Sequence, residues 1–122
     1  MTDRWLYFAQ FAKAAAETGS FKAGETIFQA GDRASELYVI ASGRVEIRIN
    51  DRVIATLGEH EIFGEMALID NAPRSATAVA ATDVSLVPID EKQFIHLVRH
   101  LPYFALNVMR TLSRRLRNAQ SV

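Results

Sequence analysis

The sequence predicts a mainly β protein with flanking helices: a β-sandwich or jelly roll of about eight short strands. Short apolar runs separated by turn residues fill about residues 20–89 at near-regular spacing. Apolar residues at helical spacing precede them, over about 3–17, and follow them, over about 90–118. No repeat or linker interrupts the 122 residues, so we expect one domain over 1–122.

The N-terminal helix and the first strands have clear boundaries in the sequence. Asp3 can cap the helix predicted over about 3–17, and Gly19 can stop it. From Ser20 onward the segments ETIF and ELYVIAS read as strands between turn residues.

The clearest β-hairpin lies in the middle of the chain. The segment RVEIRI alternates strictly, with Val45, Ile47 and Ile49 on one face. Asn50 and Asp51 form a tight turn, after which RVIATL returns as the partner strand.

Two helices are predicted after the last strand. Asp90 begins the first, with Gln93 at the position of a capping box. Pro102 can open the second, predicted over 103–118, in its first turn. That helix carries one apolar stripe: Phe104, Val108, Leu112 and Leu116. A stripe of this kind is most often core packing, although it can also pair across a two-fold axis.

The composition excludes several classes of protein. The chain is 49% hydrophobic and 23% charged, with 14 basic and 14 acidic residues, so it is not built to coat nucleic acid. It has no cysteine, which excludes disulfides and Cys-ligated metals. No apolar run approaches the ~18–20 residues that span a bilayer, and the N-terminus lacks the pattern of a signal peptide. We therefore expect a cytoplasmic protein without a membrane span.

The C-terminal region is basic. No acid follows Glu91, whereas five arginines do. These are Arg99, Arg110, Arg114, Arg115 and Arg117. They can form a solvated helix face that complements the helix dipole, or a surface for an acidic partner.

The segment FGEMALIDNAPRSATA, residues 63–78, breaks the strand pattern and gathers groups that bind anions. Gly64 lets backbone approach a ligand, and the good helix formers after it predict one short helical turn. After a turn ending at Pro73, Arg74 and Ser75 enter a strand of small residues that leaves a hollow. An arginine binds phosphate through charge-assisted, often bidentate hydrogen bonds.

Glu65, nine positions before Arg74, fits a second part of the same ligand. A phosphate would repel this carboxylate, so Glu65 must serve a hydroxyl donor such as a sugar. Phosphate and sugar together indicate a nucleotide. The alternative is a salt bridge between Glu65 and Arg74 across the loop, without any ligand.

The same segment resembles the phosphate-binding cassette of cyclic nucleotide-binding domains, the family of the catabolite activator proteins and the regulatory subunits of cyclic AMP-dependent kinase. The resemblance rests on these cassette residues: Phe63, Gly64, Glu65, Ala67, Leu68, Pro73, Arg74, Ala76 and Thr77. Upstream, the LYVIASGRVEI run and Gly24, Ile27, Gly31 and Gly43 are also similar to the family. The likeness covers about residues 20–115 and implies a double-stranded, jelly-roll-like β-roll.

The resemblance implies a role for each cassette residue. Arg74 would pair with the exocyclic oxygens of the cyclic phosphate, and Glu65 would accept a hydrogen bond from the ribose 2′-hydroxyl. The backbone at the short helix would contribute through Gly64, Met66 and Ala67, and the phosphate side would be lined by Ser75 and Ala76. The serine after the arginine favours cyclic AMP over cyclic GMP.

The family comparison also bears on the end of the chain and on the lid over the base. The chain stops soon after its last helix, so we expect no helix-turn-helix and no direct DNA binding. A lid residue usually covers the base in this family. The candidates are Tyr103, Phe104 and Arg110.

Catalysis is poorly supported. His60 stands alone, and His96 and His100 lie four apart on a helix without an acidic third ligand, so we expect no metal site. Ser75 has no base arranged near it in the sequence, and we predict no catalytic residue.

The sequence therefore predicts a non-enzymatic regulatory module for signal transduction that binds a cyclic nucleotide and changes conformation with it. Its effector protein is unknown, and the last helix can form a homodimer. The alternatives are a β-roll interaction domain that no longer binds nucleotide and, from a third class, a cupin-like metal enzyme.

Overall fold

A computed structural model of the chain describes residues 19–120, with side chains to 118. The strands and helices are β1 (Ser20–Phe21), β2 (Thr26–Phe28), β3 (Glu36–Ser42), β4 (Val45–Ile49), β5 (Arg52–Leu57), β6 (Ile62–Phe63), α2 (Glu65–Asp70), β7 (Thr77–Ala80), β8 (Val84–Asp90), α3 (Glu91–His100) and α4 (Pro102–Gln120). The helix expected over about 3–17 lies outside the described residues.

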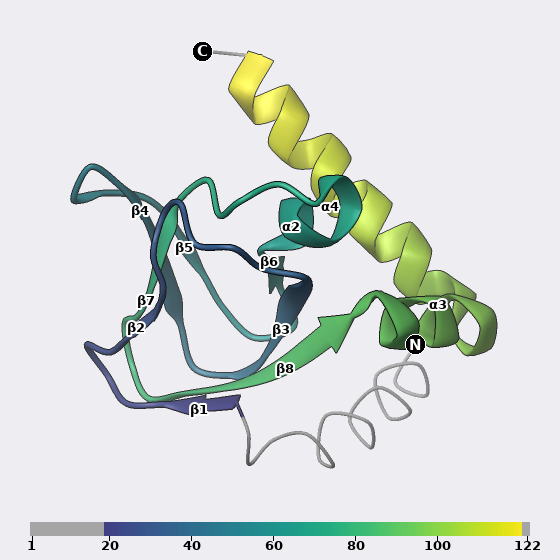
Figure 1. Cartoon of the computed structure of the whole chain (residues 1–122), viewed down its shortest axis with the longest axis horizontal. Helices are drawn as coiled ribbons and strands as arrows, with labels where there is room; N and C mark the ends of the chain where they lie inside the picture. Colours follow the sequence, from purple (N-terminus) through teal and green to yellow (C-terminus); the bar gives the residue numbers. More distant parts are fainter. Residues whose placement is uncertain (1–18, 121–122) are drawn as a thin grey trace. The chain divides into compact units, whose positions relative to one another are not determined.

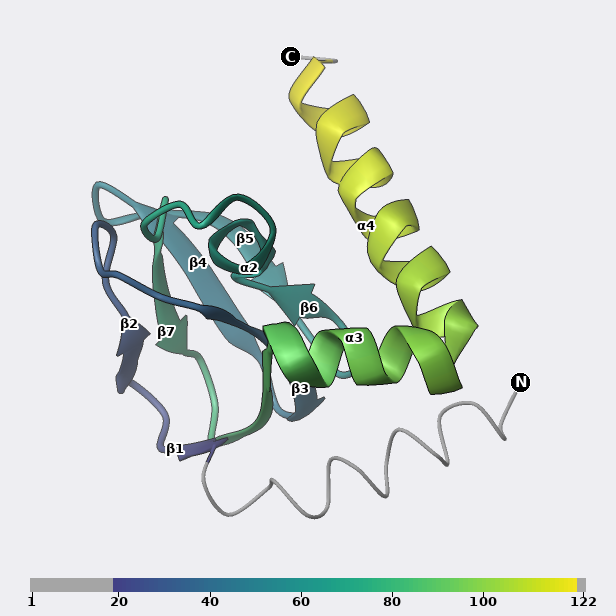
Figure 2. The same ribbon diagram turned by 45° about the vertical axis from the view of Figure 1, so that its right-hand side comes forward.

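Within residues 19–120, eight strands form two four-stranded antiparallel sheets, ordered β1-β8-β3-β6 and β2-β7-β4-β5 (Figures 1 and 2). This confirms the predicted mainly β, jelly-roll-like fold. The core lies between the sheets and draws buried side chains from both. Its members are Ile40, Phe63, Val84 and Leu86 from one sheet and Val45, Ala78 and Ala80 from the other.

The predicted hairpin is formed by β4 and β5, with Ile49 paired to Arg52. Both turn residues have left-handed backbone angles, with φ 52° at Asn50 and 65° at Asp51. Asn and Asp tolerate this conformation, and the resulting turn matches the twist of the strands. The local chemistry of these two residues therefore sets the register of the hairpin.

The chain divides after Glu91 into two compact units, residues 1–91 and 92–122. The first contains the β-roll and α2. The second contains α4 and all of α3 after its first residue, and within it the rings of Phe94 and Phe104 meet edge to face at 5.7 Å. Both helices were predicted, and α4 begins at Pro102 as expected. Within residues 19–120, no helix combines the length and the apolar character needed to cross a membrane.

Candidate functional site

The short helix α2 begins at Gly64, directly after β6. Gly64 has φ 75° and ψ 18°, a left-handed conformation that costs a residue with a side chain about 1–2 kcal/mol. The helix ends at Asn71, which is also left-handed. A helix of six residues thus turns the chain out of one sheet and towards β7 of the other, as the sequence predicted.

Arg74 lies in the segment that returns to β7, and its backbone is fixed by the loop between β2 and β3. Its N–H donates to the carbonyl of Asp32 at 2.9 Å, and its carbonyl accepts from the N–H of Gly31 at 2.7 Å. The β2–β3 loop therefore sets where the arginine side chain starts.

The guanidinium of Arg74 is buried, with 6% of the residue exposed. Its Nη1 donates to the carbonyl oxygen of Gly64 at 2.9 Å, while its Nε has no hydrogen-bond partner among the described residues. The group lies over the ring of Phe28, with Cζ 4.0 Å from the centroid, and 5.5 Å from that of Tyr38. A buried cation with an unpaired donor is rare in proteins and marks a candidate anion site.

Gly64 is required for a second reason besides its backbone angle. A Cβ at this position would collide with Nη1 of Arg74 and come within 3.6 Å of the Phe28 ring. Glycine therefore permits the close approach of the arginine to the start of α2.

Burial shifts the pKa values of Arg74 and of its neighbour Tyr38. Desolvation lowers the pKa of Arg74, and the charges of Tyr38 and Glu36 oppose that shift. Desolvation, together with a hydrogen bond from the Tyr38 hydroxyl to Glu36 Oε1 at 2.8 Å, raises the pKa of Tyr38 to about 12. Arg74 remains charged at neutral pH, since an arginine titrates far above it.

Glu65 is the first residue of α2 and is also buried, with 6% exposed. It does not form the salt bridge with Arg74 that the sequence left open. The ion pair seen among the described side chains joins Arg48 and Glu46. The site thus contains a buried carboxylate and a buried guanidinium that do not neutralise each other by contact.

The remaining cassette residues line the same turn. Met66 is 51% exposed, and its Sδ lies 4.0 Å from the hydroxyl of exposed Ser75. Ala67 and Ala76 are buried. The structure therefore brings together Gly64 with Arg74, ten residues apart in the sequence, and Met66 with Ser75, nine residues apart.

The lid candidates belong to a different unit of the chain. Tyr103, Phe104 and Arg110 lie on α4, where Phe104 contacts Phe94. Tyr103 and Arg110 are exposed. Which residue covers a ligand stays a prediction.

The sequence missed Phe28 and Tyr38 as parts of the site. Both stand in ordinary strand patterns, in β2 and β3, and nothing local connects them with Arg74. The contact depends on the register between distant strands, because aromatic residues on strands of different sheets meet only where both point into the same part of the core.

The histidines form no recognisable metal site. His96 and His100 lie side by side on α3, with ring centroids 4.3 Å apart, and His60 lies in a turn with φ 71°. Within the described part of the chain, no three His, Cys, Asp or Glu side chains gather closely enough to hold a metal ion.

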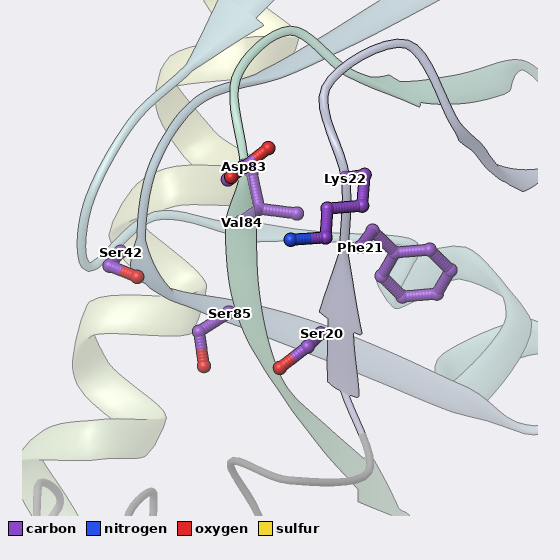
Figure 3. Close-up of a pocket in the computed structure, with 7 residues that line it drawn as sticks. All are labelled: Ser20, Phe21, Lys22, Ser42, Asp83, Val84 and Ser85. Carbon is purple, nitrogen blue, oxygen red and sulfur yellow. The ribbon is translucent and has the colours of Figure 1, made fainter.

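A pocket of about 280 Å³ lies elsewhere on the roll, where β1 meets β8 (Figure 3). Its lining residues are Ser20, Phe21, Lys22, Ser42, Asp83, Val84 and Ser85. None of them belongs to the cassette. The candidate anion site is therefore identified by the buried guanidinium of Arg74, and this pocket is a separate feature of the roll.

The fold and the site define a class of ligand-binding β-roll domain. Residues 18–100 match the family model described as "Cyclic nucleotide-binding domain", and the chain belongs to that family. This confirms the resemblance seen in the cassette.

Individual relatives agree with this assignment. The chain is 43% identical over 101 residues to the cyclic AMP receptor protein of Thermus thermophilus, covering 79% of this chain and 47% of that protein. It is 42% identical over 81 residues to the cAMP-dependent protein kinase regulatory subunit of Candida albicans, covering 66% and 18%. The crystal structure of the Thermus thermophilus catabolite activator protein superposes with a TM-score of 0.74 at 36% identity, covering 91% of this chain and 56% of that one. The chain thus spans about half, or less, of the length of these curated relatives.

Proposed function

We propose that the cassette binds a cyclic nucleotide, cyclic AMP in preference to cyclic GMP, and that the domain is a non-enzymatic regulator. The observation that carries this proposal is the buried guanidinium of Arg74 with its unpaired Nε. Leaving a donor of a buried cation unpaired costs free energy, and a phosphate would supply both the acceptor and the opposite charge.

Within the proposal each cassette residue has one task. Arg74 binds the exocyclic oxygens of the cyclic phosphate, and Glu65 accepts a hydrogen bond from the ribose 2′-hydroxyl. Backbone of Gly64, Met66 and Ala67 approaches the ligand at α2. Ser75 and Ala76 line the phosphate side.

The burial of Glu65 supports its assignment. A phosphate would be repelled by a buried carboxylate, whereas a hydroxyl can donate to it. The absence of an ion pair between Glu65 and Arg74 supports separate tasks for the two groups on one ligand.

The preference for cyclic AMP rests on Ser75 and on the relatives. The family often has threonine after the arginine where cyclic GMP is preferred, and this chain has serine. Two of its relatives are named for cyclic AMP.

We propose that binding shifts a conformational equilibrium, with a residue of α4 closing over the base. The division of the chain into two compact units after Glu91 is compatible with such a switch, which requires two arrangements of its parts. Hydrogen exchange of α4 with and without cyclic AMP measures it. Equal protection in both states would exclude the switch while leaving the binding site in place.

We also propose that the protein forms a homodimer through α4. The conformational change is transmitted either through this dimer or through an effector protein. Met109 and Leu116 are exposed on α4 and lie seven residues apart, the spacing of a helix-pairing seam. Sedimentation of wild type and Leu116→Lys measures this association. A wild type that stays monomeric at high micromolar concentration would leave only the effector route.

A cytoplasmic location and the absence of direct DNA contact stay predictions. The alternative of an interaction domain without ligand is separated from the main proposal by calorimetric titration. We expect heat on titration with cyclic AMP, weaker binding of cyclic GMP, and no heat with adenosine 5′-monophosphate or inorganic phosphate. No heat with either cyclic nucleotide at high micromolar concentration would favour the interaction domain.

A further inference from the structure

The cation of the site is held by aromatic faces. The Cζ atom of Arg74 is 4.0 Å from the ring centroid of Phe28 and 5.5 Å from that of Tyr38. Among the described residues, no carboxylate forms an ion pair with Arg74. The contacts of the guanidinium thus include the carbonyl of Gly64 and the faces of the two rings.

The rings of Phe28 and Tyr38 are partly buried and pack against the core cluster. The ring centroid of Phe28 lies 6.2 Å from that of Tyr38 and 5.8 Å from that of Phe63. The ring centroids of Tyr38 and Phe63 are 5.4 Å apart. Phe63 is only 2% exposed, and the three rings come from β2, β3 and β6, which belong to both sheets. The platform under Arg74 is thus packed against the core of the roll through Phe63, which limits the rotation of its rings.

A ring and a carboxylate hold a guanidinium in chemically different ways. A carboxylate binds the edge of the group, takes up its N–H donors and cancels its charge. An aromatic face attracts the same cation through its quadrupole and leaves the edge donors and the net charge available. The unpaired Nε of Arg74 is the donor that such an arrangement leaves open.

We propose that Phe28, assisted by Tyr38, is a positioning residue that holds the face of the Arg74 guanidinium so that its edge is aimed at the anion. This inference rests on the proposed cyclic nucleotide site. It goes beyond that site because the residue that orients the arginine lies outside the cassette. Through this orientation, Phe28 also determines how the site discriminates between the two exocyclic oxygens of the phosphate.

The size of the effect follows from the strength of such contacts. Cation–π attraction in desolvated sites is worth enough to change an equilibrium about 5- to 30-fold. Phe28→Leu should therefore weaken cyclic AMP binding by about that factor. Phe28→Tyr, which keeps the ring, should restore binding to within about threefold of wild type.

The first measurement does not depend on the nucleotide. In the NMR spectrum of ¹⁵N-labelled protein, the Nε–H signal of Arg74, assigned with Arg74→Lys, should show a ring-current shift and slow exchange with water. Phe28→Leu should remove that shift, and Phe28→Tyr should keep it. This readout tests the positioning even if the protein binds no cyclic nucleotide.

The second measurement uses the two phosphorothioate diastereomers of cyclic AMP, in which sulfur replaces one or the other exocyclic oxygen. A fixed guanidinium edge discriminates between them, so the affinity ratio should move towards one in Phe28→Leu. Phe21→Leu is the matched control. Phe21 packs against the same core cluster but makes no ring contact with Arg74 in the described structure, and its variant should keep the wild-type ratio.

The outcomes separate this inference from the proposed function. If wild type binds cyclic AMP but Phe28→Leu keeps both the Nε–H shift and the diastereomer ratio, the positioning role is wrong and the binding site stands. If wild type binds no cyclic nucleotide, the proposed function fails and the Nε–H signal alone decides the positioning. A loss of thermal stability that is equal in Phe28→Leu and Phe21→Leu, with the ratio unchanged in both, would reduce Phe28 to a packing residue.

Discussion

Arg74 Nη1 donates a hydrogen bond to the carbonyl oxygen of Gly64 across 2.9 Å, joining the two ends of the cassette. The nine residues between Gly64 and Arg74 form one closed turn that contains α2. This single contact explains why a glycine and an arginine occur at this spacing: the glycine leaves the space that the arginine occupies. The following predictions test that relationship and the residues around it.

Replacing Gly64 with alanine should damage the site more than the fold. The new Cβ would collide with Arg74 Nη1, and the left-handed backbone would cost about 1–2 kcal/mol. Gly24→Ala is the matched control, since Gly24 has φ +89° but open space around its Cβ position. Urea unfolding should show similar losses in both variants, whereas calorimetry should show weaker cyclic AMP binding only in Gly64→Ala. Equal affinity in the two variants would mean that the collision has no functional consequence.

Removing the charge of Glu65 should affect only ligands that carry the ribose hydroxyl. For wild type we expect 2′-deoxy cyclic AMP to bind about 10-fold or more weakly than cyclic AMP, because the hydrogen bond from the ribose 2′-hydroxyl to the buried Glu65 is lost. In Glu65→Gln the two ligands should differ much less. Calorimetric titration of both proteins with both ligands measures the coupling. If Glu65→Gln keeps the whole wild-type difference in affinity between the two ligands, another residue binds the 2′-hydroxyl.

Adding a methyl group at Ser75 should shift the base preference. The hydroxyl of Ser75 is exposed and lies beside Met66, so a threonine fits without disturbing the core. We expect Ser75→Thr to gain affinity for cyclic GMP relative to cyclic AMP, and Ser75→Ala to show no such gain. Competition binding gives the ratio for each variant. An unchanged ratio in Ser75→Thr would remove this position from base selection.

The phenol of Tyr38 should make stability depend on alkaline pH. Its pKa is raised to about 12, mainly by burial, so the folded state keeps a proton that the unfolded chain loses near pH 10. The stabilisation is complete below about pH 10 and falls as the pH rises towards about 12. Urea unfolding at about pH 9 and about pH 11 should show a smaller decline in Tyr38→Phe than in wild type. Identical declines would mean that Tyr38 titrates normally in the fold.

The sequence predicted those parts of the molecule that depend on neighbouring residues. The Asn50–Asp51 turn, the start of α4 at Pro102 and the short helix after Gly64 all follow from local backbone chemistry, and the structure contains them. The roles of Glu65 and Arg74 at two parts of one ligand stay a prediction, drawn from their place in one continuous segment.

The aromatic support of the arginine could not be predicted in the same way. Phe28 and Tyr38 reach Arg74 because β2 pairs with β7 and β3 lies in the facing sheet, which is a matter of register between distant strands. Alternating strand patterns tell which residues point inward but not which of them meet. The unpaired Nε is likewise a property of packing, and only the structure reveals it.

The affinity of Arg74→Met for cyclic AMP tests the central claim most directly. Methionine fills much of the same space without the charge, so the free energy of unfolding should stay equal or rise once the buried unpaired donor is removed. Binding should weaken at least about 30-fold, since a buried charge-assisted contact to the phosphate is lost. A folded Arg74→Met protein that binds cyclic AMP as tightly as wild type would contradict the account.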